Sequence, residues 1–234
     1  MIDTLLITDT ETTGIEPSEG HVTIEVAIVV FSIKTASIIE CFSSLIKHPT
    51  NAAQSINRIS PESLAEAACA SYVWGQVNDC IQSYTHQAAF LAHRAEFDKK
   101  FYRADIAAKH PWICSKFDID WPRGTPGASL VELALAHDIP VHANHRALTD
   151  CLLLAKILER AAELGPQDGI GLAGMIALAM RPKTKVQALV SFADKQKAKD
   201  AGFGWDGKIW SKNIATVDLE HMIFNFKTKV LENV

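Results

Sequence analysis

Residues 4–14, Thr-Leu-Leu-Ile-Thr-Asp-Thr-Glu-Thr-Thr-Gly, lead from a short apolar strand directly into two acids. Because side chains alternate between the faces of an extended strand, Asp9 and Glu11 are expected on one face and Thr10 on the other. Neighbouring carboxylates repel each other unless a cation lies between them, and Mg²⁺ and Mn²⁺ prefer such oxygen ligands. The stretch therefore predicts a strand end that holds a divalent cation. A lone Asp-x-Glu pair is also typical of a solvated surface.

Two further acids lie near predicted ends of secondary structure. Residues 88–93 are typical of a strand and residues 95–102 of a helix, so Asp98 is expected near a strand-to-helix junction. Residues 151–158 predict an apolar helix with Asp150 at its N-terminal end, where the helix dipole stabilises an acid even without a metal. His145 precedes this acid in the expected loop, where a lone histidine is most often only solvated.

Three segments together resemble the sequence motifs of the DEDDh exonucleases, the DnaQ-like or proofreading-subunit type of 3′–5′ exonuclease. The segments are Asp9-Thr-Glu11 with its Thr-Thr-Gly, residues 92–98 (Ala-His-Arg-Ala-Glu-Phe-Asp), and His145 placed before Asp150. The resemblance implies an α/β fold of the ribonuclease H-like type, in which helices flank a mixed sheet. Its intervening segments match those of the family over residues 24–29, 55–60 and 112–115.

The resemblance also implies a mechanism. Four acids would hold two divalent ions, Mg²⁺ or Mn²⁺, roughly 3.5–4 Å apart, with Asp9 bridging both. His145 would take a proton from the attacking water, because imidazole titrates near neutral pH. The expected reaction removes nucleoside 5′-monophosphates from DNA 3′ ends, with single-stranded or frayed ends preferred. The four metal ligands implied are Asp9, Glu11, Asp98 and Asp150.

The resemblance implies that Thr10, Thr12 and Thr13 line the pocket of the terminal nucleotide, although Thr13-Gly14 is equally typical of a turn. Two positions depart from the family pattern. Arg94 stands where the family commonly has Asn, and Asn57 stands where His is common. A guanidinium suits phosphate, so Arg94 is a candidate contact to the nucleic-acid backbone.

Two other functions remain open. An exoribonuclease that trims RNA 3′ ends would use the same five residues, because they do not distinguish the sugars. A non-catalytic nucleic-acid-binding adaptor could retain the fold, but the intact set of four acids and His145 argues against it.

Composition is that of an ordinary globular chain. Its 234 residues, 48% of them hydrophobic, can bury a full core beside a smaller domain. The N-terminus has neither the basic start nor the long apolar core of a signal peptide, and no apolar run approaches the roughly 20 residues of a membrane span. Five scattered cysteines without a Cys-x-x-Cys pair favour reduced thiols, hence a cytoplasmic location and no membrane partner.

Charge divides the chain unequally. Residues 181–234 contain ten Lys and Arg against six Asp and Glu, a net charge of +4, whereas residues 1–180 carry −8. The basic tail is where extra affinity for nucleic acid is expected, since Lys and Arg contacts to phosphate supply most sequence-independent binding.

The tail predicts a separate α+β module. Residues 186–192 alternate like a strand, residues 195–201 form a basic helix, residues 203–210 suggest a hairpin with Asp-Gly in its turn, and residues 219–231 predict a final amphipathic helix. The pattern is similar to small modules of DNA-processing enzymes, and the exodeoxyribonuclease X type also carries a short C-terminal module.

Stacking tryptophans and phosphate-binding lysines would fit single-stranded nucleic acid, whereas tryptophans in so small a domain are equally typical of its core. A protein partner or self-association therefore stays open. The candidate contacts are Lys195, Lys197, Lys199, Trp205, Lys208, Trp210 and Lys212. The predicted organisation is an exonuclease domain over residues 1–165, a helical linker over 166–182 and the module over 183–234.

Overall fold

The computed structural model describes residues 2–84, 87–125, 127–141, 145–165, 170–205 and 207–233. Its larger sheet has the strand order β3-β2-β1-β4-β5. β2 pairs antiparallel with β1 and β3, whereas β4 runs parallel to β1 and β5 runs parallel to β4. This mixed sheet confirms the predicted α/β class. The strands are β1 (Thr4–Thr12), β2 (Thr23–Ser32), β3 (Ser37–Leu45), β4 (Ala88–Ala92) and β5 (Trp112–Cys114).

β1 lies at the centre of this sheet and is buried on both faces. Leu5 and Ile7 belong to the core on one face, and Leu6 belongs to the core on the other. A strand covered on both faces has a continuous apolar sequence, which is what residues 5–7 show. Since the alternation continues along the strand, Asp9 and Glu11 emerge on the face of Leu5 and Ile7.

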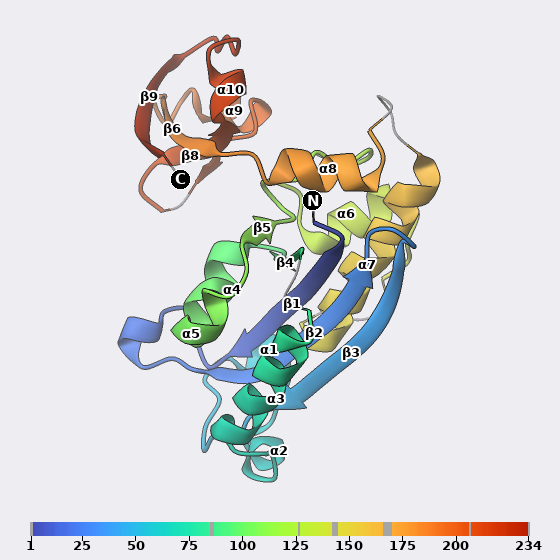
Figure 1. Cartoon of the computed structure of the whole chain (residues 1–234). Coiled ribbons are helices and arrows are strands. Elements are labelled where there is room, and N and C mark those ends of the chain that lie inside the picture. The colour runs from blue at the N-terminus through green and yellow to red at the C-terminus, as the bar shows by residue number, and fades with distance from the viewer. Residues whose placement is uncertain are drawn as a thin grey trace.

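Two long helices cover the two faces of the sheet. α7 (Ala147–Leu164) buries Cys151, Leu154 and Leu158 against the face of Leu5 and Ile7. α3 (Ala70–Gln82) covers the opposite face with an apolar stripe that includes Val73 and Val77. In Figure 1 the two helices lie on either side of the strands. Apolar residues spaced three and four apart give each helix one face that packs on the sheet.

Short helices complete this part of the chain. Two residues separate the end of β4 from the start of α4, which confirms the predicted strand-to-helix junction beside Asp98. α6 starts with a capping box, in which the Ser129 hydroxyl accepts from the Glu132 N–H and the Glu132 carboxylate accepts from the Ser129 N–H. The short segments are η1 (Pro17–Glu19), α1 (Gln54–Asn57), α2 (Pro61–Ala65), α4 (Ala95–Phe101), α5 (Ala104–Ala107) and α6 (Leu130–Ala136).

The C-terminal residues form a second, antiparallel sheet of strand order β7-β8-β6-β9. Its own core includes Val186, Phe203 and Ile214. In Figure 1 this module, coloured orange to red, lies beyond α8. Its elements are β6 (Lys183–Leu189), α9 (Lys195–Asp200), β7 (Gly204–Trp205), β8 (Trp210–Ala215), α10 (Thr216–Leu219) and β9 (Lys227–Asn233).

The predicted final helix over residues 219–231 is wrong. Only α10 is helical there, and residues 227–233 form β9, which pairs with β6. Without this pairing, one edge of β6 would expose a row of unpaired backbone N–H and C=O groups. Pairing with β6, which is distant in sequence, therefore outweighs the local helical pattern of this segment. The hairpin prediction is confirmed by the pairing of Trp205 with Trp210, although Asp206 of its turn lies outside the described residues. The strand predicted over 186–192 runs from Lys183 to Leu189.

α8 (Leu172–Ala179) lies within the predicted linker. Its Leu172, Ile176 and Ala179 are buried in the same core as α7. We therefore propose that α8 belongs with the larger domain and that the boundary lies close to Lys183. Among the described residues, no helix is both long enough and apolar enough to cross a membrane.

Candidate active site

Three predicted metal ligands meet where β1 ends and α7 begins. Asp9, Glu11 and Asp150 offer carboxylate oxygens that all lie within 4.8 Å of one another. The first two come from one face of β1, and Asp150 lies in the first turn of α7, which packs on that face. Asp150 Oδ2 accepts a hydrogen bond from the backbone N–H of His145 at 3.2 Å. The geometry thus joins acids that are far apart in sequence.

Asp98 reaches the same strand from the other side. Its Oδ1 accepts hydrogen bonds from the backbone N–H and from the hydroxyl of Thr10, both at 2.9 Å. The residue is only 2% exposed. It lies outside the group of three acids, and it is held beside that group because Thr10 stands between Asp9 and Glu11.

Burial raises the pKa of every acid in this cluster, and repulsion from neighbouring acids adds to this effect at Asp9, Glu11 and Asp150. Burial, followed by Asp150 and Glu25, raises the pKa of Glu11 to about 8. Burial raises the pKa of Asp98 to about 7, although hydrogen bonds from Thr10 act in the opposite direction. Burial also raises the pKa of Asp9, well above its usual value, and that of Asp150. Glu11 and Asp98, with pKa values of about 8 and about 7, therefore keep protons near neutral pH unless a cation replaces them.

The residues present fit a divalent cation. Asp150 Oδ1 is buried and has no hydrogen-bond partner among the described residues. A buried carboxylate oxygen without a partner carries a cost that a cation removes. Because all the surrounding ligand atoms are hard oxygens, Mg²⁺ or Mn²⁺ suits the site better than a metal that prefers sulfur.

The raised pKa values predict that divalent ions stabilise the protein more at high pH. A carboxyl whose pKa rises from 4.5 unfolded to about 8 folded makes the metal-free fold less stable as pH rises through that interval. Mn²⁺ relieves this repulsion, so it should raise the melting temperature more at pH 8.5 than at pH 6. Thermal unfolding with Mn²⁺ or EDTA at both pH values measures the difference. Glu11→Gln should reduce the difference between the two Mn²⁺-induced rises in melting temperature. Equal rises at pH 6 and pH 8.5 in the parent would contradict the assignment of these acids as metal ligands.

His145 lies at the entrance to α7. Its backbone is left-handed, with φ of 63°, and its side chain is exposed. The ring lies close enough that its positive form lowers the pKa of Asp150. Residues 142–144, just before it, lie outside the described part of the chain. The structure thus brings the predicted base next to the predicted metal ligands.

The sequence analysis missed Glu25 and Arg146. Glu25 is 3% exposed, lies opposite Glu11 on β2, and accepts two hydrogen bonds from the Arg146 guanidinium at 3.0 and 2.8 Å. Its carboxylate also accepts a hydrogen bond from the backbone N–H of Ala147 at 3.1 Å. Glu25, although remote in sequence, thus caps the N-terminus of α7. This ion pair holds the helix that carries Asp150. The available signal was a single acid inside the otherwise apolar stretch of residues 24–31.

The threonines after the first acid take part in the turn. The Thr12 hydroxyl donates to the carbonyl of Gly14 at 2.6 Å, and the Thr13 hydroxyl accepts from the N–H of Val22 at 3.0 Å. Buried Asn57, one of the two departures from the family pattern, donates to the Thr12 carbonyl at 3.2 Å. These bonds hold the turn beside the acids, while the predicted substrate contacts of the threonines stay a prediction.

Arg94 is the N-cap of α4 and adopts a left-handed backbone, with φ of 88°. Asn tolerates this conformation better than most residues, which accounts for its use at this position in the family. The Arg94 side chain is exposed. Next to it, burial lowers the pKa of His93 to about 4, so this ring is neutral at pH 7. His93 contacts the Ser115 hydroxyl and the Ala128 carbonyl.

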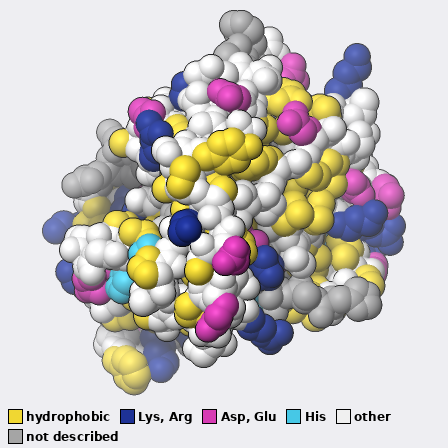
Figure 2. Space-filling view, turned by 90° about the horizontal axis from the view of Figure 1, so that it is seen from below, with side chains coloured by type: hydrophobic (Ala, Val, Ile, Leu, Met, Phe, Trp, Pro, Cys, Tyr) yellow, Lys and Arg dark blue, Asp and Glu magenta, His cyan; other side chains and the backbone are white. Residues whose placement is uncertain are grey.

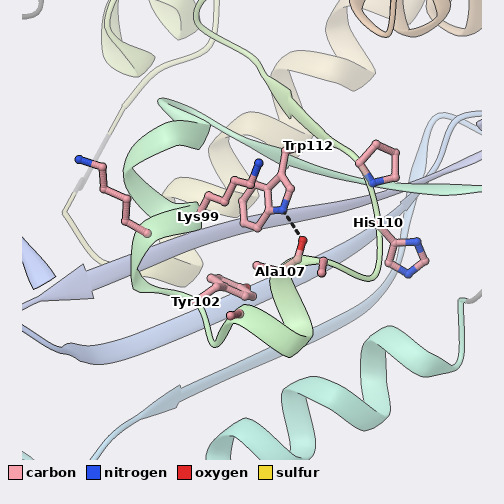
Figure 3. A pocket seen from close by; sticks show the side chains of 9 residues that line it. Lys99, Tyr102, Ala107, His110 and Trp112 are labelled. Atoms are coloured by element: carbon pink, nitrogen blue, oxygen red, sulfur yellow. Dashed lines mark hydrogen bonds between the residues drawn. The ribbon is translucent and has the colours of Figure 1, made fainter. Parts of the chain in front are cut away.

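A hollow of about 510 Å³ lies apart from the acids, between α4, α5 and β5 (Figure 3). Its lining includes Lys99, Tyr102, His110 and Trp112, and the Trp112 indole N–H donates to the Ala107 carbonyl at 2.9 Å. None of the described residues that line it carries a carboxylate, so the hollow does not suit a metal ion. Asp9, His93 and Asp150 line a separate small cavity of about 10 Å³.

The predicted nucleic-acid residues of the C-terminal module differ in their surroundings. Trp205 is 54% exposed, and its ring centroid lies 5.4 Å from that of Trp210, which packs against the module core. Among the lysines, Lys197 pairs with Asp194 at 2.8 Å. Lys195 lies over the ring of Phe192, an exposed aromatic that the sequence analysis did not assign. Lys199 faces Trp210, and Lys208 is exposed.

Lys212 is turned inward, because its ammonium donates to the Ala201 carbonyl at 3.0 Å and burial lowers its pKa. Figure 2 shows acidic, basic and apolar side chains interspersed on the face of the molecule that is seen from below. On this face, attraction for an anionic polymer would therefore arise from local groups of residues.

The sequence profile of the RNase T family, described as exonuclease, matches residues 6–158. No curated protein sequence matches the chain. Among solved structures, exonuclease X in complex with 5′ overhanging duplex DNA has a TM-score of 0.51 and 24% identity, over 75% of this chain and 99% of that one.

Two further structures share the fold. The nuclease domain of 3′hExo, a DEDDh family member bound to rAMP, has a TM-score of 0.57 and 20% identity, over 70% of this chain and 94% of that one. The zinc-bound complex of E. coli exonuclease I with single-stranded DNA has a TM-score of 0.58 and 18% identity, over 85% of this chain and 50% of that one.

Proposed function

This chain belongs to the RNase T family of exonucleases, as a 3′–5′ exonuclease of the DEDDh type, and from that premise we propose that it removes nucleoside 5′-monophosphates from DNA 3′ ends. Single-stranded or frayed ends are its preferred substrates. The observation that carries the proposal is the meeting of Asp9, Glu11 and Asp150 within 4.8 Å, with Asp98 held beside them through Thr10.

Asp9, Glu11, Asp98 and Asp150 would hold two divalent ions, Mg²⁺ or Mn²⁺. Ions held there would supply positive charge against the charge that develops at phosphorus. His145 accepts a proton from the attacking water at an imidazole nitrogen. Its backbone bond to Asp150 keeps it at this position, and the pair of Glu25 with Arg146 fixes the start of α7.

Thr10, Thr12 and Thr13 line the pocket of the terminal nucleotide, and Arg94 contacts the phosphate backbone. The exposed guanidinium of Arg94 supports this role, because it lies at the start of α4, the helix that carries Asp98. All five cysteines are free thiols, which suits the reducing cytoplasm.

An exoribonuclease is the second candidate. It is supported by the likeness to 3′hExo, whose structure contains rAMP, alongside the likeness to exonuclease X with DNA. The five active-site residues serve either sugar. A non-catalytic adaptor has less support, because such a protein has no need to keep four mutually repelling acids and a histidine together.

One assay separates these functions. The full chain is incubated with 5′-labelled single-stranded DNA, duplex DNA with a frayed 3′ end, and RNA, in Mg²⁺, Mn²⁺ or EDTA. Stepwise shortening of DNA with release of nucleoside 5′-monophosphate, abolished by EDTA, is the expected result. Faster shortening of RNA would favour the second candidate, and binding without any shortening would favour an adaptor.

In the C-terminal module we expect Trp205 to stack on a base. Trp205→Ala should weaken binding of single-stranded oligonucleotides by about 1–3 kcal/mol, the cost of one lost stacking contact. Fluorescence anisotropy measures the change. The matched control is Ile223→Ala, which removes another exposed apolar side chain from the same module. Equal binding by Trp205→Ala and the control would assign the module to a protein partner or to self-association.

A further inference from the structure

The turn that follows β5 links the catalytic edge of the sheet to the C-terminal module. β5 runs parallel to β4, with Ala92 opposite Cys114, and the Ser115 N–H donates to the Ala92 carbonyl at 2.9 Å. One residue further on, the His93 ring contacts the Ser115 hydroxyl at 2.9 Å. His93 also lines the small cavity beside Asp9 and Asp150. The start of this turn is therefore adjacent to the proposed active site.

The next residues of both segments are cations. Arg94 follows His93, and Lys116 follows Ser115, so the hydrogen bond between His93 and Ser115 brings the two positions side by side. Burial and the nearby Arg94 guanidinium lower the pKa of Lys116, which agrees with this placement. The Lys116 ammonium lies 5.7 Å from the centre of the Phe117 ring. Arg94, Lys116 and Phe117 thus lie one after another on a path that leads away from the acids.

Phe117 reaches the C-terminal module. The ring lies 3.6 Å from where a Cβ of Gly204 would stand, so it packs against the backbone of β7. It is still 47% exposed. The exposed Phe117 ring therefore extends the surface of the turn after β5 onto the backbone of β7.

An ion pair holds the two parts together at this point. The Lys183 ammonium, at the start of β6, lies 2.6 Å from Asp118 Oδ1, and the two side chains are only 14% and 12% exposed. Lys183 also donates to the Ala179 carbonyl at 2.6 Å, at the end of α8. Asp118 Oδ2 accepts from the Cys114 N–H at 2.7 Å. The pair therefore connects β5, α8 and β6.

We propose that Lys183 is a positioning residue: its ion pair with Asp118 holds Phe117 against β7, so that Arg94, Lys116 and Phe117 form one continuous binding surface for a single nucleic-acid strand. The inference rests on the proposed function and names the route by which the strand reaches the acids. Two cations and an exposed aromatic ring fit phosphates and a base of a single strand, since they need no particular sequence.

Kinetics on substrates of two lengths tests the proposal. In full-length Lys183→Ala the KM for a single-stranded DNA of about 12 nucleotides should rise about tenfold, the order of one lost stacking contact, while kcat stays the same. A trinucleotide, too short to reach the module, should show no change. Asp118 keeps its bond to the Cys114 N–H in this variant, so the turn itself should stay folded.

Three further variants make the test specific. Lys229→Ala removes the same charge from an exposed position of the same sheet and should leave both substrates unaffected. Lys183→Arg, which keeps a positive charge beside Asp118 and leaves the bond from the Cys114 N–H to Asp118 in place, should preserve the KM for the longer DNA. Phe117→Ala should raise this KM as Lys183→Ala does, and the double variant should add little, because both changes remove the same surface.

Binding in EDTA separates this inference from the proposed function. Anisotropy of a fluorescent single strand of about 12 nucleotides requires no cleavage, and its affinity should fall about tenfold in Lys183→Ala. The inference would be overturned if the parent and Lys183→Ala bound the strand with equal affinity. It would also be overturned if Lys183→Ala raised the KM equally for the trinucleotide and for the longer DNA. The proposed function fails independently if the parent cleaves no substrate in Mn²⁺ or Mg²⁺.

Discussion

Asp9→Ala should reduce nuclease turnover about 10³-fold or more while the fold is retained, because metal-ion stabilisation of a phosphoryl transition state is worth several kcal/mol. Asp9 stands at the centre of the acid cluster, and its pKa is raised first by burial and then by Asp98, Asp150 and Glu11. Asp150→Ala should have a similar effect, since it removes the buried Oδ1 that has no partner among the described residues.

The fold should survive Asp9→Ala because this buried carboxylate, repelled by its neighbouring acids, destabilises the metal-free protein. Removing it relieves repulsion, so the melting temperature in EDTA near pH 8 should not fall. Turnover on single-stranded DNA in Mg²⁺ and thermal unfolding in EDTA measure the two effects separately. Asp79→Ala, which removes an exposed acid on α3, is the control. If Asp9→Ala or Asp150→Ala stayed within a few-fold of the parent, the metal assignment would be wrong.

His145→Ala should slow turnover by roughly 10² to 10⁴, the usual cost of losing a general base. The effect should be smaller than that of Asp9→Ala, because the acids that hold the ions remain. The pH–rate profiles of the parent and the variant should therefore differ, because a general base contributes to the rate only in its unprotonated form.

The pH–rate profile distinguishes this role from a structural one. His145 also donates its backbone N–H to Asp150, and this bond survives the change to Ala. His221→Ala, an exposed histidine of the C-terminal module, is the control and should keep the parent profile. An unchanged profile in His145→Ala would remove this residue from the mechanism.

Several features of the molecule could be predicted because they depend on neighbouring residues. The apolar run before Asp9 predicts a strand, and the alternation of its side chains predicts that Asp9 and Glu11 share one face. The apolar run after Asp150 predicts α7, and its spacing places that acid at the helix start. Local geometry sets the direction of a side chain, so such patterns are readable without the rest of the fold.

The error at residues 219–231 has the opposite cause. The segment has enough apolar spacing for a helix, yet residues 227–233 pair with β6, whose strand begins more than 40 residues earlier. An unpaired strand edge supplies a row of backbone hydrogen bonds that no local propensity can match. The same limit explains why the sequence left Trp205 open between base stacking and a core role and did not predict the inward turn of Lys212.

The sequence by itself determined the α/β class, the strand that carries Asp9 and Glu11, and the identity and local direction of the candidate catalytic residues. Tertiary structure alone decided which partners hold them. Glu25 meets Arg146 across 121 positions, and Asp118 meets Lys183 at the junction of the two parts of the chain. Such pairs depend on how whole elements pack, and many residues in the sequence could supply an acid or a base. Only the packing brings one acid and one base within hydrogen-bond distance.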